Sequence, residues 1–187
     1  MLAGPNGAGK TTFYREFLAH VSLPFLNADL LAAEMEIDSF EAARVIDATR
    51  DRMIEDGLGF VTETVFSDRL GAKLGMLRKA IDSAYAVTLL YIGIASPELS
   101  ERRVEQRIAR GGHDVPRDRL TSRYQRSLAN LKQAIAFVPT VELFDNSLVE
   151  EPYRHIATFE DGTLAWRTEH ALPGWCRGIV PAKRRKR

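Results

Sequence analysis

Residues 4–11 read Gly4-Pro5-Asn6-Gly7-Ala8-Gly9-Lys10-Thr11 and match the pattern G-x-x-x-x-G-K-[ST] at every position. Glycines in such a loop let successive backbone N–H groups point inward around phosphate oxygens, and the helix that follows presents its positive end to the same anion. The lysine then reaches the β- and γ-phosphates, and the next hydroxyl lies on Mg²⁺. We therefore predict a nucleotide phosphate site that extends to Thr12, with Lys10 on the phosphates and Thr11 on the metal.

Other motifs decide which class of nucleotide-binding protein the loop belongs to. The residues around the loop are also typical of transporter-type ATPases, but those need a downstream Leu-Ser-Gly-Gly-Gln signature and an apolar strand that ends in Asp-Glu. Neither occurs in this chain. A GTPase would need Asn-Lys-x-Asp to bind guanine, and that motif is absent too. The pattern favours a phosphotransferase that uses ATP.

Strand-like and helix-like segments alternate along the chain, which predicts an α/β fold with a mainly parallel sheet and flanking helices. A chance glycine turn at residues 4–11 would not be followed by a helix in such a pattern. The expected strands are 1–3, 23–27, 59–62, 87–92 and 141–144, and the expected helices are 11–20, 41–54, 70–81, 97–110 and 120–135. The first strand is short for one that should be central. A C-terminal β-hairpin is expected over 156–167, around Asp161-Gly162.

Local signals support several of these elements. Ser96-Pro97 has the form of an N-cap followed by proline at the first helical position. Gly57 is placed to end the helix over 41–54. One apolar stripe is expected on the helix over 70–81, formed by Leu70, Leu74, Leu77 and Ile81. We predict one domain over residues 1–170 and a C-terminal extension over 171–187, which ends in a basic tail expected to be disordered.

Composition narrows the class of protein. The net charge of +1 comes from 26 basic and 25 acidic side chains, so nothing in the overall charge favours a nucleic-acid partner. The single cysteine, Cys176, has no partner for an internal disulfide, as is typical of a reducing cytoplasm. The longest apolar run, residues 86–95, is about half of what a membrane span needs. A phosphate-binding motif that starts at Gly4 is not compatible with a signal peptide, so a cytoplasmic protein without a membrane segment is expected.

Two acidic residues follow expected strands, namely Asp29 and Glu63. In a parallel sheet both would lie at the carboxyl edge, where ligands bind, and would face the glycine loop. A kinase needs one carboxylate to orient the attacking hydroxyl and accept its proton, and gains from a second that supports Mg²⁺. We assign Asp29 as the base and Glu63 as the metal or substrate orienter. The alternatives are that Asp29 only caps a helix over 30–35 and that Glu63 is an ordinary loop acid.

Arg103, Arg107 and Arg110 are spaced i, i+4 and i+7, so they would share one helix face. The glycine-rich break over 111–116 follows directly, as a mobile lid would require. Arginines on such a lid could neutralise charge on the γ-phosphate during transfer. We assign Arg107 and Arg110 to this role because they are nearest the break. The alternative is a solvated face on which the arginines pair with neighbouring glutamates.

Several short segments, taken in order with the glycine loop, resemble the zeta toxin family, in particular its short bacterial branch. They are Asn27-Ala28-Asp29, Thr62-Glu63-Thr64, Ser96-Pro97-Glu98-Leu99-Ser100 and Gly111-Gly112-His113-Asp114-Val115-Pro116. The resemblance runs from Leu2 to about Asn146 and continues weakly through the expected hairpin. It implies a three-layer P-loop fold like that of nucleotide kinases.

The resemblance also implies an activity. Zeta toxins use ATP and Mg²⁺ to phosphorylate the sugar of UDP-N-acetylglucosamine, and a small antitoxin protein blocks their nucleotide site. By motif match, Lys10 and Thr11 take the phosphate roles. Asp29 falls on the catalytic aspartate and Glu63 on an acid after the third strand. Arg107 falls on a lid arginine.

The match is incomplete in the lid. The family's second arginine has no clean counterpart, because Gly112-His113 occupies that stretch and Arg110 is only a spatial candidate. Three hypotheses follow: a small-molecule kinase of the zeta type, a kinase for another acceptor such as a nucleoside, an antibiotic or a polynucleotide end, or an ATP-gated interaction module with little turnover.

Overall fold

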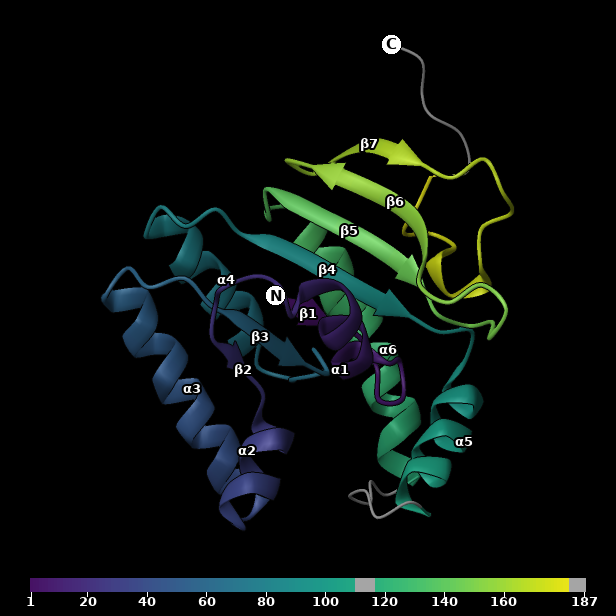
Figure 1. Ribbon diagram of the computed structural model, residues 1–187. Coiled ribbons are helices and arrows are strands. Elements are labelled where there is room, and N and C mark those ends of the chain that lie inside the picture. The colour runs from purple at the N-terminus through teal and green to yellow at the C-terminus, as the bar shows by residue number, and fades with distance from the viewer. Residues whose placement is uncertain (110–116, 182–187) are drawn as a thin grey trace.

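A seven-stranded sheet forms the centre of the computed structural model, which describes residues 1–109 and 117–181 (Figure 1). The strand order is β2-β3-β1-β4-β5-β6-β7. The strands are β1 (Leu2–Ala3), β2 (Phe25–Leu26), β3 (Val61–Thr64), β4 (Thr88–Gly93), β5 (Thr140–Asp145), β6 (Arg154–Glu160) and β7 (Thr163–Arg167).

The first five strands pair in parallel, and β6 and β7 add to the β5 edge in antiparallel pairs. The predicted α/β class with a mainly parallel sheet is therefore confirmed. Because parallel strands all end at one edge, the segments after β1, β2, β3, β4 and β5 come together there. This edge carries the candidate site.

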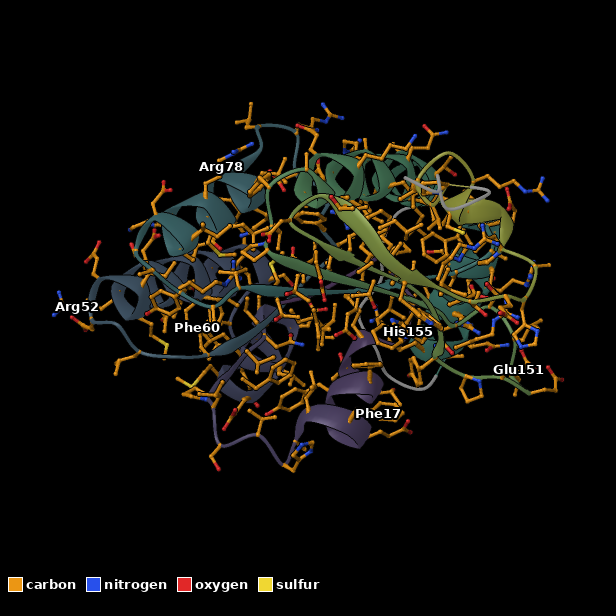
Figure 2. The ribbon with its side chains drawn as sticks, turned by 90° about the horizontal axis from the view of Figure 1, so that it is seen from above. Phe17, Arg52, Phe60, Arg78, Glu151 and His155 are labelled. Atoms are coloured by element: carbon orange, nitrogen blue, oxygen red, sulfur yellow. The ribbon has the colours of Figure 1, made fainter. Side chains whose placement is uncertain are left out.

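The helices cover both faces of the sheet. They are α1 (Lys10–Phe13), continued by a π-helical turn (Tyr14–Leu18), α2 (Ala28–Met35), α3 (Ser39–Glu55), α4 (Ala72–Asp82), α5 (Pro97–Ile108), α6 (Arg117–Ile135) and a short 3₁₀ turn (Gly174–Cys176). Viewed from above, Arg78 on α4 and Phe17 in the π-helical turn lie on opposite sides of the sheet (Figure 2). The result is the expected three-layer arrangement.

The first strand is short, yet it is central. Leu2 and Ala3 are fully buried, and they pair with β3 on one side and β4 on the other. The chain turns into the glycine loop at once, because Gly4 has a φ of 146°. A Cβ at Gly4 would lie 2.2 Å from the carbonyl oxygen of Ile92 on β4, so only glycine lets the loop start this close to the sheet.

Most local predictions are confirmed and one is wrong. Asp161 and Gly162, with φ of 46° and 75°, form the tight turn between β6 and β7. The Ser96 side chain accepts a hydrogen bond from the Leu99 amide, as expected of an N-cap. Leu70 does not belong to the apolar stripe of α4: it precedes the helix and is 96% exposed, whereas Leu74 and Leu77 are buried.

Packing continues past residue 170. Trp175, Cys176 and Val180 all belong to the main hydrophobic core. The Trp175 ring lies against Gly93 of β4, where a Cβ would come within 2.3 Å of the ring. Both Arg110 and the basic tail over 183–187 lie outside the described residues. In the part of the chain that is described, no helix is long and apolar enough to cross a bilayer.

Candidate active site

The glycine loop joins β1 to α1 and is held from outside on two sides. On the first side, α5 supplies two donors: Ser100 Oγ donates to the Asn6 carbonyl at 2.8 Å, and Arg103 Nη1 donates to the Gly7 carbonyl at 3.3 Å. A Cβ at Gly7 would lie 3.0 Å from Arg103 Cβ, so the helix packs directly on the loop.

On the second side, residues beyond β5 supply two more donors. Asn146 Nδ2 donates to the Ala8 carbonyl at 2.9 Å, and the Tyr153 hydroxyl donates to the Gly9 carbonyl at 3.0 Å. Since the N–H of a trans peptide points opposite to its C=O, the amides that follow these carbonyls point to the inner side of the loop. Of these, the Ala8 amide closes a turn onto the Pro5 carbonyl at 3.3 Å. The geometry matches a phosphate cradle.

Lys10 and Thr11 lie at the start of α1 and meet Glu63 from β3. Lys10 is 6% exposed, and its Nζ lies 3.1 Å from the Pro5 carbonyl and 3.8 Å from Glu63 Oε1. Thr11 Oγ1 donates to Glu63 Oε2 at 2.8 Å, and Asn27 Nδ2 donates to the same oxygen at 2.7 Å. Glu63 is therefore no ordinary loop acid, because it joins the loop to the end of β2.

Asp29 lies in the first turn of α2, and Asn27 is the residue that caps this helix. The Asn27 Oδ1 accepts hydrogen bonds from the amides of Asp29 and Leu30, at 2.9 and 3.1 Å. The alternative in which Asp29 itself caps a helix is therefore wrong, and its carboxylate is not needed there. Sequence reasoning missed Asn27, although asparagine before a helical run is a recognised capping signal.

The pKa of Lys10 depends on the charged residues around it. Burial lowers the pKa of Lys10, the charges of Glu63 and Asp29 raise it, and the charge of Arg107 lowers it. Two carboxylates and one guanidinium therefore act on the lysine that should bind phosphate. With Thr11, which bonds to Glu63, five of the residues that the sequence singled out act on this part of the site.

The three arginines expected on one face of α5 have different surroundings. Arg103 binds the glycine loop, which sequence reasoning did not anticipate because it favoured the arginines nearer the break. Arg107 is exposed and acts electrostatically on Lys10. Arg110 lies outside the described residues.

A cavity of about 420 Å³ opens beside this cluster. Asp29 and Glu63 line it together with charged residues from α3, α4, α6 and the segment after β3. The charged members beyond these two acids are Asp47, Arg50, Asp68, Arg69, Lys73, Arg123 and Arg126.

Sequence reasoning missed the basic lining of this cavity, although one signal was present. The buried residues of α3 are Ala42, Ile46, Arg50 and Ile54, which are spaced by four. An arginine on an otherwise apolar helical stripe is unusual, because arginine is rarely buried without a partner.

The residues beside the phosphate cradle fit a magnesium ion that is also held by phosphates. Thr11 and Glu63 place a hydroxyl and a carboxylate oxygen 2.8 Å apart beside the phosphate cradle. Mg²⁺ in nucleotide sites typically takes one or two such protein oxygens and completes its shell with phosphate oxygens and water. Among the described residues no group of three acidic, histidine or cysteine side chains forms an all-protein metal site.

Comparison with known proteins identifies relatives by sequence. A sequence model of the Zeta toxin family matches residues 33–162. These residues include Glu63 and Arg107 but not the glycine loop or Asp29. An uncharacterized protein of Haemophilus influenzae is 28% identical over 127 residues, which cover 65% of this chain and 88% of that protein.

Solved structures share the fold at low sequence identity. The AvrRxo1-ORF1:-ORF2 complex with ATP has a TM-score of 0.66 at 16% identity, over 88% of this chain. The PezAT chromosomal toxin–antitoxin system of Streptococcus pneumoniae has a TM-score of 0.56 at 15% identity, over 93% of this chain and 73% of that one. A putative kinase of Chloroflexus aurantiacus has a TM-score of 0.51 at 17% identity, over 80% of this chain and 90% of that one.

This chain spans 58% of the AvrRxo1 chain that it matches. The family match covers more than half of the 187 residues, and it agrees with a fold built on a phosphate-binding loop. The chain therefore belongs to the Zeta toxin family and is a P-loop protein of the kinase type.

Proposed function

We propose that this protein transfers the γ-phosphate of ATP to a hydroxyl of a small molecule that binds in the 420 Å³ cavity. One observation carries the proposal. Asp29 and Glu63 line this cavity, and both also act on Lys10 of the phosphate cradle. An acceptor bound in the cavity would therefore contact a carboxylate where the cavity adjoins the phosphate cradle.

Asp29 acts as the general base in this proposal. The acceptor oxygen attacks the γ-phosphorus, the bond to the β–γ bridging oxygen breaks, and ADP leaves. Asp29 accepts the proton of the attacking hydroxyl and later releases it to water. Its carboxylate is available for this task because Asn27, and not Asp29, caps α2.

Lys10, Thr11 and Glu63 bind the phosphate end. Lys10 places a positive charge against the β- and γ-phosphates, and the loop amides hold their oxygens. Thr11 and Glu63 would hold Mg²⁺. When bound, the ion supplies positive charge to the β- and γ-phosphate oxygens.

Arg107 stabilises the charge that develops during transfer. It is exposed at the end of α5, and its charge lowers the pKa of Lys10, which supports a role near the phosphates. Arginines in this role act mainly in the transition state. We propose Arg110 as a second such arginine.

The sugar of a UDP-sugar such as UDP-N-acetylglucosamine is the acceptor that the family suggests. We also propose that a small antitoxin protein covers the nucleotide site and that the protein acts in the cytoplasm. Two relatives of the same fold are named as two-component complexes, one of them a toxin–antitoxin system, which supports a partner of this kind.

A phosphoryl-transfer screen tests the proposal. Labelled ATP with Mg²⁺ is incubated with the protein and with UDP-sugars, nucleosides, aminoglycosides or oligonucleotides, beside Lys10→Ala. We expect transfer to one acceptor class, and loss of both transfer and ATP-dependent thermal stabilisation in Lys10→Ala. Stabilisation by ATP at a hundredfold excess over Kd amounts to about 2.7 kcal/mol. ATP binding without transfer to any class would instead favour an ATP-gated interaction module.

A further inference from the structure

The net charge of +1 combines two parts of the chain with opposite charge. Residues 170–187 contain six of the 26 basic side chains and none of the 25 acidic ones. The first 169 residues therefore hold 20 basic and 25 acidic side chains, a net charge of −5. Residues 119–141, which include most of α6, contain no acidic side chain either. A net charge near zero thus does not argue against a strongly basic surface on one part of the molecule.

Basic side chains from separate elements meet at the C-terminal segment. Lys132 is exposed in the last turn of α6, and its Nζ lies 4.0 Å from the position that a Cβ at Gly178 would take. Arg177 is exposed beside that glycine. Arg167 of β7 donates from Nη1 to the Pro181 carbonyl at 2.8 Å. Tertiary packing therefore brings together cations that are far apart in the sequence.

Acidic side chains do not neutralise this group. Among the described residues, neither Lys132 nor Arg177 forms an ion pair with a carboxylate. Glu169 is the only acidic residue in the stretch 162–187, whereas residues 183–187 add five more basic side chains. A lysine in the last turn of a helix interacts favourably with the helix dipole, but that accounts for one cation only. The convergence of cations from α6, β7 and the segment after β7 indicates an anionic partner.

An exposed tryptophan lies beside these cations. Trp166 precedes Arg167 on β7, and its side chain is 47% exposed. The Trp166 ring stacks on His155, with the ring centroids 4.6 Å apart. Trp166 and Arg167 also line one cavity of about 420 Å³ at β7. An aromatic ring next to cations is the combination with which proteins bind single-stranded nucleic acid, because bases stack on the ring while the cations pair with phosphates.

The surroundings of the cations favour nucleic acid over other polyanions. Basic segments that bind anionic membranes are strengthened by apolar side chains that insert into the lipid. The large apolar side chains of residues 170–181 are buried or half-buried and cannot insert; they are Leu172, Trp175, Ile179 and Val180. An acidic protein would pair with the cations but would leave the exposed ring of Trp166 without a role.

We propose that single-stranded nucleic acid binds to a basic surface formed by Lys132, Arg167, Arg177 and residues 183–187, with a base stacked on Trp166. The phosphates of the strand pair with the cations, and neither sequence nor acceptor chemistry is read. The inference does not depend on the proposed phosphoryl transfer, because these residues belong neither to the phosphate cradle nor to the cavity beside it.

Fluorescence anisotropy with labelled single-stranded RNA and DNA tests the proposal, using strands longer than a typical site of about 4–16 nucleotides. The full chain is saturated with Mg²⁺ and ADP, so that the strand does not bind in the phosphate cradle. Lys132→Gln/Arg177→Gln is compared with Arg52→Gln/Lys79→Gln, which removes the same charge from exposed residues of α3 and α4. Arg52 lies at the end of the molecule opposite to His155 (Figure 2).

The salt dependence of binding identifies the cations involved. For single strands, log K falls against log[salt] with a slope of about −0.7 for each phosphate that is neutralised. Lys132→Gln/Arg177→Gln should therefore make the slope shallower by about 1.4 and weaken binding by at least about fivefold at 0.1 M salt. The control pair should behave as the wild type. Replacing the five basic residues over 183–187 by glutamine should weaken binding further.

Stacking is tested separately from charge. Trp166→Leu should weaken binding by about fivefold or more without changing the salt slope, because a stacked base is lost and no phosphate contact is. In the wild type, a bound strand should quench the fluorescence of Trp166, since Trp175 is only 5% exposed. This quenching should be absent in Trp166→Leu.

Several results would overturn the proposal. They are absent binding by the wild type at low salt, equal loss in the two charge pairs, and an equal affinity for polyglutamate of matched charge. Binding to vesicles of phosphatidylserine and phosphatidylcholine without binding to oligonucleotides would assign the basic surface to membranes instead. The salt slope and the quenching are measured on the wild type, so the proposal stays falsifiable even if a variant fails to fold.

Discussion

The phosphate cradle and the cavity proposed for the acceptor lie side by side but are built in different ways. In the cradle, the carbonyls of residues 6–9 each accept a hydrogen bond from a side chain of another element. In the cavity, Arg50 Nε and Asp68 Oδ1 are buried without partners among the described residues. The outward carbonyls of the cradle are fixed by the fold itself, whereas buried side-chain atoms without partners among the described residues occur in both regions, since Asn6 Oδ1 of the loop is a third such atom.

This difference teaches where the two parts of the site obtain their specificity. A rigid cradle suits a ligand end that is always the same, the phosphates of ATP. Unpaired buried groups are costly to a folded protein. Changes in the cradle should therefore affect stability and nucleotide binding together, whereas changes at the cavity should affect acceptor use.

The largest effect is expected at the boundary between the two regions, at Asp29. Asp29→Asn should reduce transfer by about 10² to 10⁴, the usual contribution of a general base, with ATP affinity nearly unchanged. Single-turnover transfer and the Kd for ATP are measured side by side. Asp38→Asn is the control, because Asp38 caps α3 on the surface. If Asp29→Asn loses ATP binding together with transfer, Asp29 belongs to the cradle and not to the acceptor side.

A smaller effect separates two arginines of the same helix. Arg107→Ala should slow transfer by at least about tenfold with little change in ATP affinity, because its charge is needed mainly in the transition state. Arg103→Ala should instead weaken ATP binding, since its guanidinium holds the Gly7 carbonyl. Steady-state kinetics and ATP titration of both variants test the pair. A transfer rate within about threefold of the wild type in Arg107→Ala, less than 1 kcal/mol of barrier, would leave Arg107 on a solvated face.

Loss of one cradle contact should reduce stability. Asn146→Ala leaves the buried Ala8 carbonyl without its donor, at a cost of about 1–3 kcal/mol in the free energy of unfolding. Urea denaturation measures this loss, and ATP affinity should fall with it. Ser100→Ala removes a partly buried contact on the other side of the loop and should cost less. If the Asn146→Ala protein keeps wild-type stability and ATP affinity, the loop does not need the hydrogen bond from Asn146 to the Ala8 carbonyl.

The smallest effect is expected at Cys176, which lies in the core away from both regions. Burial raises the pKa of the Cys176 thiol to about 11, and its Sγ–H donates to the Pro173 carbonyl. The thiol should therefore stay protonated near neutral pH and react very slowly with disulfide reagents in the native protein, but quickly in denaturant. Stability from the neutral thiol is present below pH about 9 and is lost as the pH rises through about 11. Rapid labelling of the native protein would show that the segment after residue 170 opens readily.

Site residues could be predicted from the sequence where the pattern that marks them lies in neighbouring residues. The cradle is a contiguous motif, and the α/β pattern placed Asp29 and Glu63 at strand ends, although Glu63 proves to lie within β3 (Val61–Thr64), near its carboxyl end. Asn27 was within reach of the same reasoning, because a helix cap is a local feature. Arg50 carried a local signal too, as an arginine on an otherwise apolar helical stripe, whereas the surroundings of Asp68 depend on the tertiary structure.

By itself, the sequence determined the phosphate loop, the α/β fold and the presence of acids near the carboxyl ends of two strands, since hydrophobic periodicity and glycine spacing are encoded in neighbouring residues. Only the tertiary structure decided that Arg103 holds the loop and that the described part of the C-terminal segment joins the core. The packing of Trp175 against Gly93 links residues 82 positions apart, and no local pattern specifies such a contact. The same holds for the acceptor cavity, whose lining converges from α3, α4, α6 and the segment after β3 once the sheet has brought these elements together.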